Sequence, residues 1–83
     1  MNKHKLLERL KKHQKNVRFN DFLALIKSYE FQLIRINGSH HIFEHSDISE
    51  MVNAQNDNGQ AKPYQIKQFL AIIEKYNLRM EDD

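Results

Sequence analysis

Two segments of the chain carry apolar side chains at helical spacing and flank a strand-like middle. The first segment predicts a helix over residues 19–29, and the second predicts a helix over residues 63–76. Pro63 suits the first position of the second helix, because proline fixes φ and has no N–H to leave unpaired. The apolar positions are Phe19, Phe22, Leu23 and Ile26 in the first segment, and Ile66, Phe69, Leu70, Ile73 and Tyr76 in the second.

The middle of the chain changes to a strand pattern. Residues 31–36 are rich in β-branched and aromatic side chains and contain no breaker, so they predict a strand. Asn37-Gly38 is a strong hairpin signal and predicts a return strand over residues 40–45. Residues 50–55 form a weaker third strand, and residues 56–60 form a polar loop of turn-forming residues.

These elements predict an α+β domain in the order α-α-β-β-β-α. The sheet has three antiparallel strands, and both amphipathic helices pack on one face of it, because neither helix can cover its apolar stripe alone. Leu6, Leu7 and Leu10 predict an extra helix over residues 3–14. The chain has 83 residues, of which 40% are hydrophobic, so we expect a single domain with one modest core.

The composition excludes some kinds of functional site and favours others. The chain has no cysteine, which excludes disulfides and thiolate metal sites. No apolar run reaches the length of a membrane span or signal peptide, so we expect a cytoplasmic protein. The net charge is only +2, but basic side chains dominate the segment from Lys3 to Arg18, where Glu8 is the only acid. This segment is either a basic helix that follows phosphates or a solvated surface helix.

Three histidines follow the Asn37-Gly38 turn. A two-residue loop at this turn places His40 opposite Arg35, whereas a bulge at Gly38 shifts the pairing by one residue. His40 is either a proton-transfer group or an ordinary exposed strand residue. His41 and His45 share a strand face and could suggest a metal site. The lack of cysteines, and Glu44 on the opposite face, lead us to expect no metal.

One stretch resembles a known family. Arg35-x-x-Gly38-Ser39-His40-His41-Ile42-Phe43 lies between a hydrophobic helix and a final helix that opens at Lys62-Pro63. This order, over about residues 19–77, resembles the HicA toxin family, also described as YcfA-like mRNA interferases, with a double-stranded-RNA-binding-domain-like fold. The resemblance divides the single domain 1–83 into a basic N-terminal helix (1–15), a HicA-like core (16–78) and an acidic tail (79–83). The N-terminal helix and the long polar segment before Pro63 depart from the compact family pattern.

The resemblance implies the toxin of a type II toxin-antitoxin system, which acts in stress responses and is silenced by a HicB-type antitoxin. The implied activity is endoribonuclease cleavage of mRNA by a catalytic histidine, here His40, with no metal or other cofactor. RNA supplies its own 2′-hydroxyl nucleophile, so proton transfer and positive charge suffice. The products would then carry a 2′,3′-cyclic phosphate. The residues expected to bind RNA are Arg35, Ser39, Lys62 and Lys67.

Two other classes of function are also compatible with the sequence. The chain could be a non-catalytic RNA-binding module of the same double-stranded-RNA-binding-domain-like fold, which would bind RNA by shape and backbone. It could also be an interaction protein whose sheet only docks a partner. RNA cleavage distinguishes the first from a nuclease, and salt-sensitive RNA binding argues against the second. Oligomeric state and cleavage preference are not predicted by the sequence.

Overall fold

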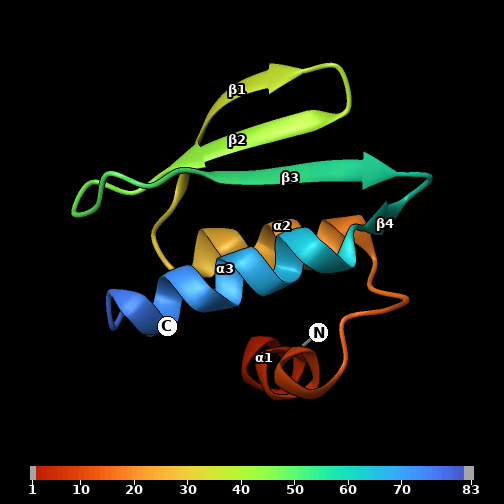
Figure 1. Ribbon diagram of the computed structural model, residues 1–83, viewed down its shortest axis with the longest axis horizontal. Coiled ribbons are helices and arrows are strands. Elements are labelled where there is room, and N and C mark those ends of the chain that lie inside the picture. Colours follow the sequence, from red (N-terminus) through yellow and green to blue (C-terminus); the bar gives the residue numbers. More distant parts are fainter. Residues whose placement is uncertain (1, 82–83) are drawn as a thin grey trace.

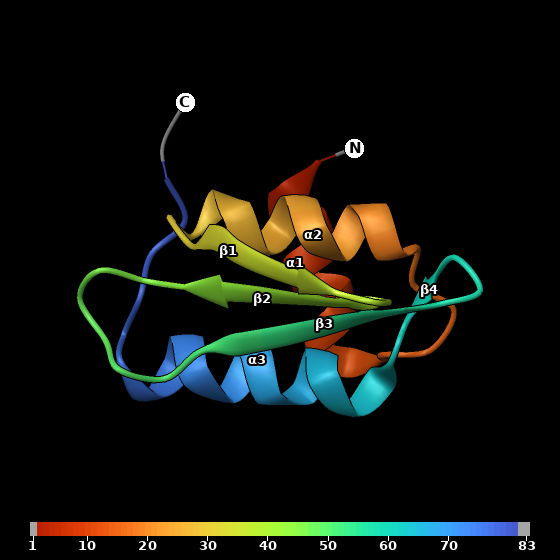
Figure 2. The same ribbon diagram turned by 90° about the horizontal axis from the view of Figure 1, so that it is seen from above.

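The computed structural model describes residues 2–81, and these residues form three layers. Helices α2 (Phe19–Ser28) and α3 (Pro63–Lys75) lie side by side on one face of an antiparallel sheet, and α1 (Lys3–Lys12) crosses the outside of these two helices (Figures 1 and 2). The α+β class is therefore confirmed. The two amphipathic helices share one face of the sheet, as expected. The helix bounds agree with the predicted ones to within two residues.

The sheet contains four strands, one more than predicted. They are β1 (Gln32–Asn37), β2 (His40–Glu44), β3 (Val52–Asp57) and β4 (Gln60–Ala61), and they lie in this order. The segment predicted as a polar loop is a tight hairpin, in which Asp57 pairs with Gln60. Asn58 and Gly59 form its turn, with φ of 53° and 85°, and asparagine and glycine tolerate this left-handed region best. The two-residue strand β4 has no periodicity that a sequence pattern could reveal.

The link before α2 is joined to β4. The backbone N–H of Ala61 donates to the carbonyl oxygen of Val17 at 2.9 Å, and the N–H of Phe19 donates to the carbonyl of Gly59 at 2.9 Å. These bonds give the free edge of the short strand a partner. They also fix the point at which α2 begins relative to the sheet.

A single core lies between the sheet and the helices and continues to α1. Phe22, Tyr29 and Phe31 each place their rings edge-on to Phe69 of α3, with centroid separations of 5.6–5.9 Å. This is the preferred geometry of aromatic pairs. Leu6 and Leu10 of α1 are buried in the same cluster. The N-terminal helix therefore contributes to the core as well as carrying charge.

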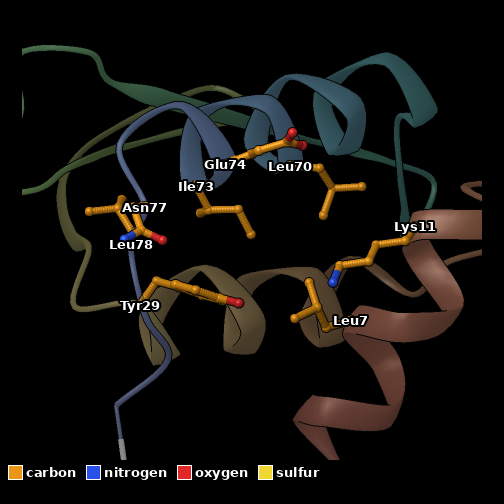
Figure 3. A pocket seen from close by; sticks show the side chains of 8 residues that line it. All are labelled: Leu7, Lys11, Tyr29, Leu70, Ile73, Glu74, Asn77 and Leu78. Carbon is orange, nitrogen blue, oxygen red and sulfur yellow. The ribbon is translucent and has the colours of Figure 1, made fainter.

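A pocket of about 550 Å³ opens where α1 faces α2 and α3, on the side of the helical layer away from the sheet (Figure 3). Four of its lining side chains are aliphatic, and Lys11, Tyr29, Glu74 and Asn77 supply its polar groups. The pocket is remote from the hairpin that carries His40.

Within residues 2–81, no helix has the length and apolar character needed to cross a bilayer.

Candidate active site on the outer face of the sheet

The turn of the β1–β2 hairpin lies one residue later than predicted, so the cross-strand partner of His40 shifts by two residues. Asn37 pairs with His40, so the two loop residues are Gly38 and Ser39. Gly38 has φ of 61°, the value that the first central position of a type II′ turn requires. An Asn-Gly pair can place either residue at the start of a tight turn, and the sequence pattern does not decide between them. The predicted direct pairing of Arg35 with His40 is therefore wrong.

Arg35 still lies on the same face of the sheet as His40. Its cross-strand partner is Ile42, two residues beyond His40, so Arg35 and His40 are diagonal neighbours. A bulge at Ile34 then shifts the register by one residue, so that Leu33 pairs with Phe43 instead of the predicted Ile42. Phe43 is fully buried against the helices. Because successive side chains of a strand point to opposite faces, Ile42 and His40 lie on the outer face of the sheet.

The ring of His40 contacts the side chain of Asn53. The Nδ1 atom of His40 lies 3.1 Å from the Oδ1 atom of Asn53, on the neighbouring strand β3. Asn53 pairs with Ile42, and His40 itself pairs with Gln55. No sequence pattern had marked Asn53 as a site residue. The alternation around buried Val52 and Ala54 places Asn53 on the outer face, but only the β2–β3 register brings it to His40.

The remaining predicted RNA-binding residues divide into two groups. Ser39 lies in the turn directly before His40 and is exposed. Lys62 is the N-cap residue of α3 and Lys67 is exposed on the same helix, so both belong to the helical layer. The β1–β2 turn and the start of α3 lie at the same end of the molecule (Figure 1). The structure therefore places Arg35 and Ser39 beside His40, and does not bring Lys62 or Lys67 onto the same face.

The other two histidines of the cluster face the helices. The His41 ring packs edge-on against Phe19 with a centroid separation of 4.9 Å, and its Nδ1 is buried without a hydrogen-bond partner. His45 is buried, and its Nδ1 accepts a hydrogen bond from the backbone N–H of Asp47 at 3.1 Å. Across the described chain, residues 2–81, no three His, Asp or Glu side chains cluster as metal ligands. His41 and His45 act in packing in this fold.

The fold and the site define a small α+β domain that presents one hydrogen-bonded, partly exposed histidine on an open sheet face. The sequence model of the family described as HicA toxin of bacterial toxin-antitoxin matches residues 19–74, which is more than half of the chain. The chain therefore belongs to the HicA toxin family, and the prediction of this family is confirmed. Comparisons with curated proteins and with solved structures gave no match. The matched region includes the whole sheet and α2, and excludes α1.

Proposed function

We propose that this chain is a metal-independent endoribonuclease that cleaves mRNA and acts as the toxin of a type II toxin-antitoxin pair. The observation that carries this proposal is the position of His40. It is the histidine that follows Gly38-Ser39 in the matched region, and it lies partly exposed on the outer face beside Arg35. A proton-transfer group must be accessible to substrate and fixed in orientation, and His40 satisfies both conditions.

The proposed reaction uses the 2′-hydroxyl of RNA as the nucleophile. His40 accepts the proton of that hydroxyl as its oxygen forms a bond to the adjacent phosphorus. The bond from phosphorus to the 5′-oxygen breaks, and the 5′-oxygen takes a proton from solvent. The products are a 2′,3′-cyclic phosphate and a 5′-hydroxyl. Arg35, on the same face, stabilises the negative charge that develops on the phosphate oxygens.

The proposed RNA path runs over the end of the molecule that carries the β1–β2 turn. Ser39 is next to His40 and can donate a hydrogen bond to a phosphate oxygen. Lys62 and Lys67 extend positive charge to the start of α3 at the same end, where the helix dipole also favours phosphate. This arrangement supports a double-stranded-RNA-binding-domain-like use of the fold, in which backbone contacts position the RNA.

We further propose that a HicB-type antitoxin silences the toxin by covering the surface around His40. Edge strand β1 lies next to this surface and leaves Leu33, Ile34 and Ile36 exposed by 40%, 42% and 57%. Exposed apolar side chains gathered on one strand are a common mark of a protein interface. A purified complex that cleaves RNA as fast as the free chain would contradict this mode of inhibition.

RNA cleavage by matched histidine variants tests the proposal. His40→Ala should remain folded and bind RNA but cleave at least ~10²-fold more slowly, the usual scale for losing a general acid–base. His4→Ala, which removes an exposed histidine of α1, is the control and should cleave normally. Excess EDTA should leave the wild-type rate unchanged. Normal cleavage by His40→Ala, or loss of cleavage in EDTA, would overturn the assignment. RNA binding without any cleavage would instead favour the non-catalytic RNA-binding module.

A further inference from the structure

We propose that Asn53 is a positioning residue for His40, which fixes the ring orientation and the tautomer from which His40 accepts a proton. This inference rests on the proposed nuclease function and adds a residue to it. The two side chains occupy diagonal positions on neighbouring strands, and their contact spans 3.1 Å between Nδ1 and Oδ1. Asn53 thereby links the site to β3, outside the hairpin that contains the family motif.

The chemistry of the two atoms sets the direction of this hydrogen bond. An amide oxygen can only accept, so the Nδ1 atom of His40 must carry the proton that it donates. In the neutral ring, the lone pair then resides on Nε2. This nitrogen is the one left available to take the proton of a 2′-hydroxyl. A histidine without this contact would favour the opposite tautomer, with its proton on Nε2 and no basic atom facing the substrate.

Hydrogen bonds hold the backbone around Asn53, and this fixes the position from which its side chain extends. Strand β3 pairs with β2 from Val52 to Gln55, and on its other side the N–H of Gln55 donates to the Gln65 side chain of α3. The side chain of Asn53 itself is exposed, which means that its truncation opens no cavity in the core. An effect of Asn53 on the reaction can therefore be separated from an effect on folding.

A neutral amide at position 53 affects the protonation of His40 differently from a carboxylate at the same position. A carboxylate would hold Nδ1–H equally well but would stabilise the protonated ring, as in a catalytic triad. The charged groups on this face of the three strands are Arg35, Glu44 and Asp57, and none of them is a direct cross-strand partner of His40. With Asn53, the ring is oriented without an adjacent negative charge.

Nitrogen NMR of the His40 ring, combined with single-turnover kinetics, tests the inference. The neutral wild-type ring should show its proton on Nδ1. Asn53→Ala should shift the population toward the Nε2–H tautomer and lower the saturated cleavage rate at least about 10-fold, because misplacement of a proton-transfer group is costly. Asn53→Asp should keep the Nδ1–H tautomer and move the acid limb of the pH–rate profile to higher pH.

Gln55→Ala is the matched control. Gln55 is the direct cross-strand partner of His40, yet no hydrogen bond joins the two side chains, so this variant should leave tautomer and rate unchanged. An unchanged tautomer or an unchanged rate in Asn53→Ala would overturn the inference. If the wild-type chain cleaves no RNA, the proposed function fails, while the NMR measurement still decides whether Asn53 sets the His40 tautomer.

Discussion

Gln65 of α3 accepts a hydrogen bond from the backbone N–H of Gln55, with 2.7 Å between Oε1 and nitrogen. Strand β4 pairs only with Asn56 and Asp57, so no strand lies beside Gln55 at that edge of β3. The side chain of Gln65 is 1% exposed and takes the place of the missing strand acceptor. Because Gln55 pairs with His40, this bond connects the helical layer to the strand position opposite the candidate catalytic residue.

Replacing this acceptor should destabilise the fold. Gln65→Leu preserves the approximate volume but leaves the partly buried N–H of Gln55 unpaired, which costs about 1–3 kcal/mol of unfolding free energy. Gln68→Leu, at an exposed position of the same helix, is the control and should change stability much less. Urea unfolding followed by circular dichroism measures both. Equal transition midpoints for the two variants would show that the hydrogen bond contributes nothing net.

Arg35 and Lys67 should affect different kinetic constants. Arg35 shares the sheet face with His40, so Arg35→Ala should lower kcat, by about 10-fold or more, through lost stabilisation of the transition-state charge. Lys67 belongs to the helical layer, so Lys67→Ala should mainly raise KM and reduce the salt dependence of binding. Steady-state cleavage at several salt concentrations separates the two effects. The same pattern from both variants would contradict this division of roles.

The basic helix α1 should support RNA affinity without taking part in the chemical step. Deleting it is not a clean test, because Leu6 and Leu10 are buried in the core. Lys5→Gln combined with Lys12→Gln removes two exposed charges and leaves the core intact. We expect weaker, less salt-sensitive RNA binding and an unchanged saturated rate. Lys27→Gln, at an exposed site on α2, controls for loss of charge in general. A fall in the saturated rate would give α1 a direct role.

The pairing of Glu50 with α3 should make stability depend on pH. Tyr76 Oη donates to the Glu50 carboxylate at 2.5 Å and Lys75 Nζ donates at 3.0 Å, and in that order they lower the pKa of Glu50 below its usual 4.5. A lowered pKa in the folded state stabilises the protein above the unfolded value and loses this effect as pH falls through the folded value.

Glu50→Gln should therefore be less stable than the wild type at pH 7 and should approach it in acid below pH 4.5. Glu74→Gln removes an exposed carboxylate without such partners and should show no comparable change. Urea midpoints across this pH range provide the measurement. A stability difference that stays constant from pH 7 into acid would argue against the linkage.

The sequence predicted elements better than it predicted pairings. Apolar spacing located α3 because Ile66, Phe69 and Ile73 are the side chains that the core buries. The hairpin was predicted, but its turn lies one residue later than Asn37-Gly38, because Gly38 adopts the left-handed φ as the first loop residue and Asn37 stays in the strand. Asn53 could not be found, because its contact with His40 depends on pairing between strands joined by a long loop.

The order of the elements along the chain has a consequence during synthesis. Strands β1, β2 and β3 pair with their neighbours in sequence, so their hydrogen bonds can form early. Their apolar face has no complete cover until α3, which follows the sheet in the chain, supplies Ile66 and Phe69. The surface that carries His40 is thus stabilised by a helix translated after it. A chain held on the ribosome before α3 is made therefore lacks the helix that completes the core beneath the candidate active site.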